Sequence, residues 1–187
     1  HNHYDHVGGV DSVLQTGVQP TVYVPPSFTT LKQHIAQSTN VIDVERGMEV
    51  APGIFTTGEM RGSPREQSLV IPTDDGIIVI TGCAHPGIVA ITAEAISLFE
   101  NADLPVILAM GGFHLMEKSE RQIDRIIEDL RDLGVQQVMP THCTGDEAIA
   151  RFAAVLGEDY IEGGVGRVIE FAITAEENEE SDPAGDA

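Results

Sequence analysis

The chain has 187 residues, 42% of them apolar, which suffices for one domain with a sizeable core. Its apolar runs are about seven residues long, far short of the roughly 18 to 20 that span a bilayer, so we expect no membrane segment. With 30 acidic and 10 basic residues the net charge is −20, which disfavours nucleic acid and anionic membrane surfaces as partners. Such an acid excess is typical of proteins from salt-loving cells, or of an acidic domain with a solvated tail.

Short β-rich runs alternate with helical patterns along the chain. In order, we predict a strand at residues 21–24, a helix at 27–37, strands at 53–57, 67–72 and 76–81, a helix at 88–101, a strand at 106–110, a helix at 119–133, a strand at 135–139, a helix at 146–156 and a strand at 165–173. Ser27 is the predicted cap of the first helix. This alternation predicts one α/β layered domain over residues 1–173. Residues 174–187 hold six acids and no base, which predicts a disordered tail.

Four metal-capable side chains open the sequence. His1, His3, Asp5 and His6 form an H-x-H-x-D-H motif, followed at once by Val7 and two glycines. Two imidazoles two residues apart can point the same way from an extended or tightly turned segment, while the next acid and histidine aim a few ångströms away. A remnant of a histidine tag would carry neither the acid nor the Gly-Gly turn. The motif therefore predicts a compact ligand set for metal.

Two later histidines follow buried strands at their carboxyl ends. His85 comes shortly after the strand at 76–81, and His142 follows the strand at 135–139. Side chains at this edge of an α/β sheet commonly bind ligands, although a lone histidine there is more often structural. Because the opening motif already predicts a metal, we expect both histidines to be ligands.

Five motifs together resemble those of the metallo-β-lactamase superfamily. After H-x-H-x-D-H come TGEMRG at residues 57–62, TGCAHPGIV at 81–89, GGFHL at 111–115 and THCTG at 141–145. They are similar to those of a subgroup of metal-dependent hydrolases that includes an archaeal enzyme of pterin synthesis, and the resemblance covers residues 1–173. It implies a four-layer αββα sandwich in which several strands precede the first motif. Since those strands are missing here, we expect this segment alone to fold poorly and to expose strand edges and apolar surface.

The resemblance also implies a ligand set and a chemistry. His1 and His3 would bind one metal ion, Asp5 and His6 a second, and His85 and His142 would complete the two shells. The ligand types favour Zn²⁺, as one or two ions, with Mn²⁺ or Fe²⁺ as alternatives. Such an ion lowers the pKa of a bound water toward about 7, and Asp5 would orient the resulting nucleophile. We therefore predict a hydrolase-type enzyme for a small, phosphorylated, pterin-like or ribosyl substrate.

The sequence departs from the superfamily pattern at two places. Many members have a histidine in a Gly-His-Thr loop where this chain has Glu59, and an aspartate after the next strand where this chain has Cys83. Either residue could join a metal shell. The alternatives are a salt-bridged loop acid for Glu59 and a buried inert thiol for Cys83.

Other polar residues near the motifs leave their roles open. His114 ends the strand at 106–110 and is predicted to lie in the active site, as a proton donor, a substrate contact or a ligand; a structural histidine is the alternative. Candidates for anion contacts are Thr144 with Gly145 and, separately, Arg61 and Arg65. The alternative for Thr144 and Gly145 is an ordinary helix cap, and the alternative for the two arginines is exposure to solvent in a loop. His34 is expected to be unrelated to the site.

Three broader expectations complete the analysis. Cys83 and Cys143 lie in histidine-containing motifs and not at disulfide spacings, which favours a reducing compartment, the cytoplasm. A nuclease is disfavoured by the charge and by the absence of a basic stripe. A redox di-iron protein of the same fold and a non-catalytic metal-binding module remain as alternatives, and the oligomeric state is not predicted.

Overall fold

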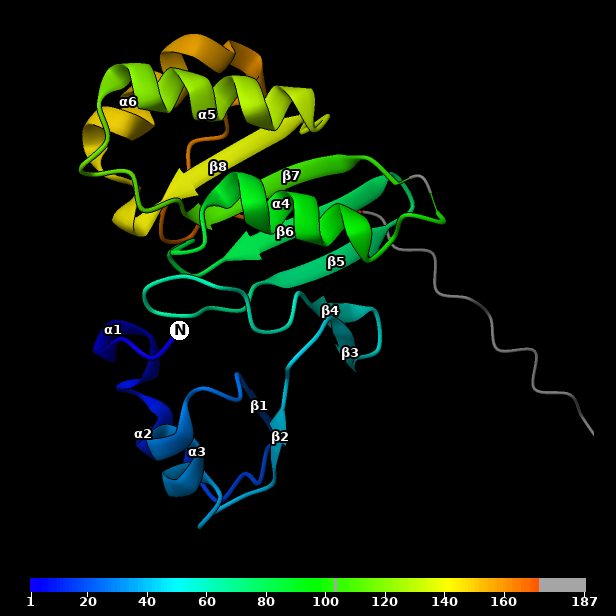
Figure 1. The fold of residues 1–187 in the computed structure, drawn as a ribbon, viewed down its shortest axis with the longest axis vertical. Helices are drawn as coiled ribbons and strands as arrows, with labels where there is room; N and C mark the ends of the chain where they lie inside the picture. Colours follow the sequence, from blue (N-terminus) through cyan, green and yellow to red (C-terminus); the bar gives the residue numbers. More distant parts are fainter. Residues whose placement is uncertain (103, 172–187) are drawn as a thin grey trace, which may run out of the picture.

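The computed structural model describes residues 1–102 and 104–171. The predicted tail at residues 174–187 lies outside this part, as do the last two residues of the strand predicted at 165–173. The architecture is mixed α/β, as expected, with a large sheet and helices around it (Figure 1).

The large sheet contains six strands that neighbour one another in sequence order. They are β3 (Met48–Ala51), β4 (Ile54–Thr56), β5 (Leu69–Thr73), β6 (Gly76–Thr81), β7 (Val106–Gly112) and β8 (Gln137–Thr141). The pairs from β3 to β6 are antiparallel, whereas β6, β7 and β8 run parallel. The parallel strands are joined by helical crossovers, so their carboxyl ends meet at one edge of the sheet.

Three helices cover one face of this sheet. They are α4 (Ile88–Ser97), α5 (Glu120–Asp132) and α6 (Asp146–Leu156). Their apolar residues pack with β6, β7 and β8 around Phe113 and Phe152, both of which are almost fully buried. Helix α5 begins with a capping box in which Ser119 and Gln122 satisfy each other's backbone N–H groups. The polar residues of the later motifs lie in the turns between these strands and the helices that follow them, so the packed helices help to fix their positions.

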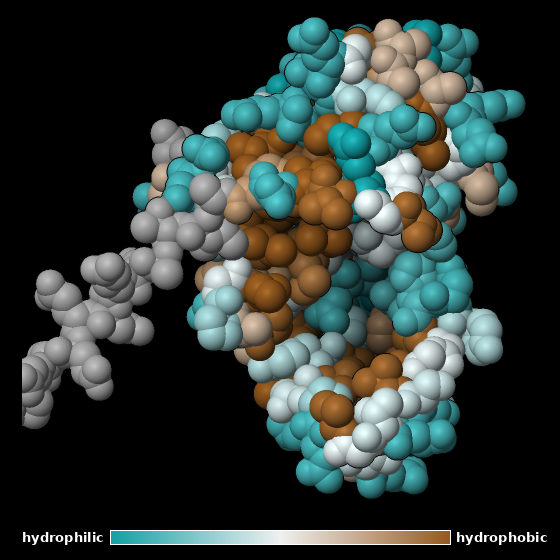
Figure 2. Space-filling model, turned by 180° about the vertical axis from the view of Figure 1, so that it is seen from behind, coloured by the Kyte–Doolittle hydropathy of each residue, from teal (hydrophilic) through white to brown (hydrophobic). Residues whose placement is uncertain are grey.

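The opposite face of the sheet is also apolar. Its cluster is formed by Ile78, Ile107, Leu108 and Met139, with partly buried neighbours Ile71, Ile80, Met110, Ile161, Ile169 and Phe171. None of these residues belongs to a helix of the described chain. Figure 2 shows this face as a broad hydrophobic patch.

The amino-terminal part forms a smaller unit beside the sheet (Figure 1). It contains α1 (Tyr4–Val7), α2 (Val10–Leu14), β1 (Val22–Val24), α3 (Thr29–Ile35) and β2 (Val41–Asp43). Strands β1 and β2 pair in parallel. The second half of the H-x-H-x-D-H motif lies on α1, whereas His3, its N-cap, keeps an extended backbone.

Several sequence expectations need correction. Residues 165–171 form no strand: Val165 and Val168 are exposed, and Arg167 N–H closes a turn on the Gly164 carbonyl. Ser27 does not cap α3, which begins one residue later than predicted for such a cap, with Phe28 at the N-cap and no side-chain cap hydrogen bond; the Ser27 N–H donates to Glu59. Strands β2 and β3 and helices α1 and α2 were not predicted. Among the described helices, none is long and apolar enough to cross a membrane.

Candidate metal centre

Two groups of potential ligands lie at the carboxyl edge of the parallel strands. The first joins His1, His3 and His85, and the second joins Asp5, His6, Cys83 and His142. Within each group, one ligand atom from every residue lies within 4.8 Å of the others. The structure thus brings together all six residues predicted as metal ligands, and adds Cys83 to the second group.

The first group is a set of three imidazoles. The ring of His1 lies 4.7 Å from that of His3 and 4.6 Å from that of His85, between centroids, and the rings of His3 and His85 are 5.0 Å apart. Both ring nitrogens of His1 and Nε2 of His85 are buried without a hydrogen-bond partner among the described residues. Buried polar atoms of this kind are normally satisfied, so the arrangement fits a metal ion that the three imidazoles would bind.

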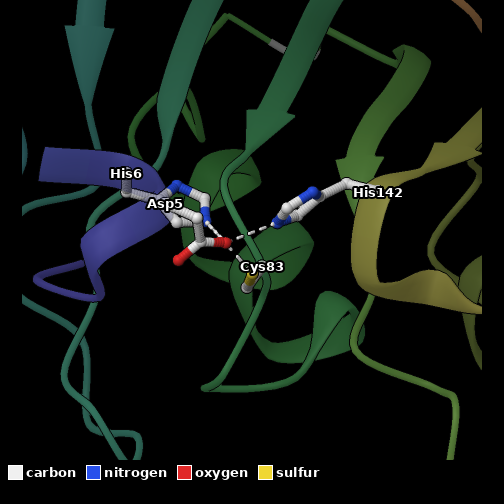
Figure 3. A group of neighbouring side chains, drawn as sticks. All are labelled: Asp5, His6, Cys83 and His142. Atoms are coloured by element: carbon white, nitrogen blue, oxygen red, sulfur yellow. Dashed lines mark hydrogen bonds and ion pairs between the residues drawn. The ribbon is translucent and has the colours of Figure 1, made fainter. Parts of the chain in front are cut away.

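The second group is built around the carboxylate of Asp5 (Figure 3). Asp5 Oδ2 lies 3.2 Å from His142 Nε2 and 3.4 Å from His6 Nε2. Cys83 Sγ lies 3.3 Å from the same nitrogen of His6. Two imidazoles, a carboxylate and a thiol form a four-residue donor set of the kind that Zn²⁺ accepts. The two groups adjoin, since the rings of His1 and His6 are 3.9 Å apart.

The turns that follow β6, β7 and β8 have an unusual backbone conformation close to the later ligands. Among residues 1–102 and 104–171, three other than glycine have a left-handed backbone: Ala84 (φ 60°), His114 (φ 52°) and His142 (φ 51°). They follow β6, β7 and β8 respectively, beside or within the two groups. Such conformations are disfavoured for these residue types and cluster at functional sites. The turns at the strand ends therefore aim Cys83, His85 and His142 at the opening motif.

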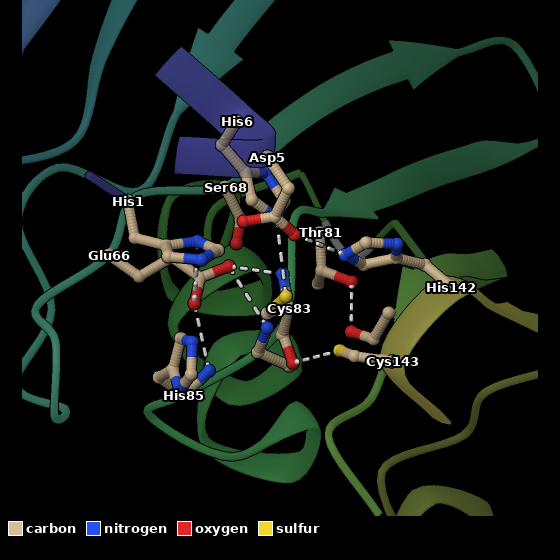
Figure 4. A network of polar contacts seen from close by, with 12 residues as sticks. His1, Asp5, His6, Glu66, Ser68, Thr81, Cys83, His85, His142 and Cys143 are labelled. Carbon is tan, nitrogen blue, oxygen red and sulfur yellow. Dashed lines mark hydrogen bonds and ion pairs between the residues drawn. The ribbon is translucent and has the colours of Figure 1, made fainter. Parts of the chain in front are cut away.

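Glu66 is a site residue that sequence analysis missed. Its side chain is fully buried, and its carboxylate accepts the N–H groups of Cys83 (2.8 Å), Ala84 (2.9 Å) and His85 (2.8 Å) (Figure 4). It also lies 3.7 Å from Nδ1 of His1. Glu66 therefore fixes the turn that presents His85 to the first group and Cys83 to the second. It also lies next to His1 of the first group. The sequence around it, R-E-Q-S, has no ligand spacing that could have revealed it.

The protonation of two imidazoles suits metal binding. Burial lowers the pKa of His6 below its ordinary value of 6.5, and the nearby Asp5 only partly offsets this effect. Burial, followed by the neighbouring His114, lowers the pKa of His85 in the same direction. Both rings are therefore neutral at pH 7, which is the form that ligates a metal. Burial and the adjacent Cys143 raise the pKa of the Cys83 thiol.

His114 lies beside the centre without joining either group. Its ring is 4.3 Å from that of His85, and its side chain is exposed. The glycines that precede it serve backbone packing: a Cβ on Gly112 would lie 2.5 Å from the Gly82 carbonyl oxygen and 2.8 Å from Cys143 Sγ. They bring the end of β7 against the turn that carries Cys83.

Other candidates lie outside the centre. Glu59 accepts hydrogen bonds from Ser27 N–H and Arg65, which lower its pKa although burial opposes them, so it is a salt-bridged loop acid. The hydroxyl of Thr144 donates to the Thr141 carbonyl and accepts the Phe113 N–H, so it is occupied within the fold. His34 pairs with Asp11, away from both groups.

Comparisons with known proteins agree with the resemblance read from the motifs. No protein-family model matches the chain. It is 27% identical to the 7,8-dihydropterin-6-methyl-4-(β-D-ribofuranosyl)-aminobenzene-5′-phosphate synthase of Methanocaldococcus jannaschii, over 91% of this chain and 73% of that protein. It is 32% identical to an uncharacterised protein of the same organism, over 49% of this chain and 33% of that protein.

One solved structure extends the agreement to three dimensions. The crystal structure of a metal-dependent hydrolase of the β-lactamase superfamily matches with a TM-score of 0.70 at 24% identity, covering 85% of this chain and 74% of that one. The predicted resemblance is therefore confirmed, and the chain has the mixed α/β fold of the metallo-β-lactamase superfamily.

Proposed function

We propose that this protein is a metal-dependent hydrolase whose centre binds two divalent ions. The observation that supports this most directly is the pair of adjoining donor groups, one of which contains buried imidazole nitrogens that accept or donate no hydrogen bond within the described residues. The relative named as a synthase and the neighbour named as a hydrolase both support an enzyme.

The donor sets favour zinc. His1, His3 and His85 would hold one ion, and Asp5, His6, Cys83 and His142 the other. Imidazole and thiolate donors suit Zn²⁺ better than Mn²⁺, which prefers oxygen ligands. When bound, the metal supplies Lewis acidity that lowers the pKa of water and polarises a carbonyl or phosphoryl oxygen.

The protein's own residues would position and protonate the reactants. Asp5, whose Oδ2 lies between His6 and His142, would help to hold the second ion and orient the attacking water. His114 is exposed at the rim, next to His85, and would deliver a proton to the leaving group. The residue proposed to orient the water thus lies on α1, and the residue proposed to donate the proton follows β7.

The substrate is proposed to be a small phosphorylated molecule of pterin-like or ribosyl type. The name of the Methanocaldococcus relative, a dihydropterin ribofuranosyl-aminobenzene phosphate synthase, motivates this choice. The free thiols of Cys83 and Cys143 suit a reducing compartment, for which we propose the cytoplasm.

Elemental analysis joined to an activity panel tests the proposal. We expect about two zinc ions per chain and turnover of at least one phosphodiester, lactone or thioester substrate. His3→Ala and Asp5→Asn should each lose metal and activity, whereas His34→Ala, a control histidine paired with Asp11, should keep both. Full metal content and activity in the His3 and Asp5 variants would refute the assignment.

A further inference from the structure

A cavity of about 590 Å³ lies between α4 and α5, next to the metal centre. Its volume falls within the range of roughly 300 to 1,000 Å³ that is typical of small-molecule sites. The proposed ligand sets use only one of its lining residues, His85. The cavity therefore has room for a part of the substrate that does not react.

The cavity adjoins the centre through two histidines. His85 and His114 both line it, with their rings 4.3 Å apart. The ring of His85 is in turn 4.6 Å from that of His1 and 5.0 Å from that of His3. A molecule held in the cavity would therefore have the end that points toward His85 next to the first donor group.

The walls of the cavity suit an apolar group. Phe113, Leu115 and Ile88 line it and are buried, which makes this wall rigid. On α4 the lining residues Ala90 and Ala93 are exposed and small, and they leave the space open. An aromatic or other flat ring system matches this combination of a rigid wall and small side chains.

Positive charge gathers at one end of the cavity, although the chain as a whole is strongly acidic. Lys118 lines the cavity, and it joins Arg121 and Arg125 in lining an adjoining hollow of about 320 Å³. Within the described residues, the side chains of these three bases make no hydrogen bond and no ion pair, although their backbone groups do. In the same part of the chain, Asp129 is the single acid that lines the two hollows. Unpaired bases in a chain of net charge −20 concentrate attraction for an anion at this point.

We infer that this cavity binds a flat, apolar ring of the substrate, and that Lys118, with Arg121 and Arg125, binds a phosphate or carboxylate attached to it. The inference deepens the proposed function and rests on it for the identity of the reacting bond. Binding itself uses only residues of the cavity, so it does not require metal. Lys118 and Ala93 would then determine which substrates bind. Lys118 would select for an anionic group by its charge, and the small side chain of Ala93 would leave space for the ring.

Calorimetric titration with 1-naphthylmethylphosphonate tests this inference, because the carbon–phosphorus bond of this probe resists hydrolysis. We expect the chain to bind it in EDTA more tightly than methylphosphonate or 1-naphthylmethanol. Lys118→Ala should weaken binding about tenfold through loss of a charge-assisted contact. Ala93→Phe, on an exposed helix position, should weaken it at least tenfold by filling the cavity. Asp129→Asn should strengthen it.

Arg167→Ala is the matched control, since it removes one exposed positive charge far along the chain, in the turn at residues 164–167. Circular dichroism would verify that each variant is folded. Equal binding by the original chain and the Lys118 and Ala93 variants would overturn the inference. Binding that appears only with zinc and ignores Lys118 would also overturn it, because the phosphonate would then sit on the metal. Loss of turnover with intact probe binding would count against the proposed function alone.

Discussion

Glu66 is the residue on which the geometry of the centre depends most. Its carboxylate accepts three backbone N–H groups from the turn at residues 83–85, entirely out of contact with water. We predict that Glu66→Gln destabilises the metal-free chain by about 2 to 4 kcal/mol, because the amide offers one oxygen and turns an NH₂ group toward the backbone donors. Chemical denaturation measures this loss.

Zinc affinity distinguishes a positioning role of Glu66 from a merely structural one. Glu66→Gln should weaken zinc binding at least tenfold, since His85 and Cys83 would no longer be aimed at the donor groups. Glu59→Gln is the control, because Glu59 is also hydrogen-bonded but lies outside both groups. Unchanged zinc affinity in the Glu66 variant would mean that the turn holds its shape without the carboxylate.

The lowered pKa values of His6 and His85 predict a pH dependence of stability. In the folded chain both residues take up a proton only below their ordinary pKa of 6.5, whereas the unfolded chain takes it up at 6.5. The contribution of these two histidines to the unfolding free energy of the metal-free protein should therefore be fully present above pH 6.5. It should be lost as the pH drops below that value. Urea denaturation in EDTA at pH 7.5 and 5.5 measures the fall. The unfolding free energy of a His6→Asn, His85→Asn double variant should fall less steeply with decreasing pH. An equal dependence on pH in both proteins would contradict the assignment.

At the scale of residues, four of the six predicted ligands could be named because H-x-H-x-D-H places metal-capable side chains at a spacing that few other roles explain; His85 and His142 were named because each follows a buried strand. It did not allow the partner of Cys83 or the role of Glu66 to be predicted. Both depend on tertiary contact between segments that lie 77 residues apart for Cys83 and His6, and 17 apart for Glu66 and Cys83. A sequence pattern carries no signal for such contacts.

At the scale of elements, the close approach of β7 to the turn after β6 is required for the centre. Gly112→Ala should destabilise the protein by about 1 to 3 kcal/mol, because its Cβ would lie 2.5 Å from a backbone oxygen that has little room to move. Gly164→Ala is the control, since no atom lies within 4 Å of its added Cβ. Thermal unfolding of both variants measures the difference, and equal melting temperatures would show that the strand end can shift without cost.

The elements that could be predicted are those with strong local patterns. Strands β6 and β7 are near-continuous apolar runs, and α5 carries an apolar face together with a capping box. The predicted strand was wrong over residues 165–171, where Ile169 and Phe171 partly bury their side chains against the sheet face without pairing their backbone as a strand. Apolar content alone does not distinguish these two ways of being buried.

At the scale of the whole molecule, the sheet has two apolar faces but described helices on only one of them. The other face, around Ile80 and Met110, forms the patch in Figure 2. We predict that the uncharged dye Nile red gains fluorescence on binding this face of the chain. An Ile80→Asn, Met110→Gln double variant should lose most of that gain. Val13→Gln, which removes an exposed apolar residue from α2, should keep it. Absence of any gain in the original chain would show that this face is covered in solution.

The central claim is that imidazoles from the start, middle and end of the chain bind metal together. Anomalous diffraction at the zinc absorption edge, from crystals of the zinc-loaded protein, tests it most directly. We predict two peaks, one among His1, His3 and His85 and one among Asp5, His6, Cys83 and His142. The absence of a peak at either position, or zinc bound only elsewhere on the acidic surface, would contradict the account.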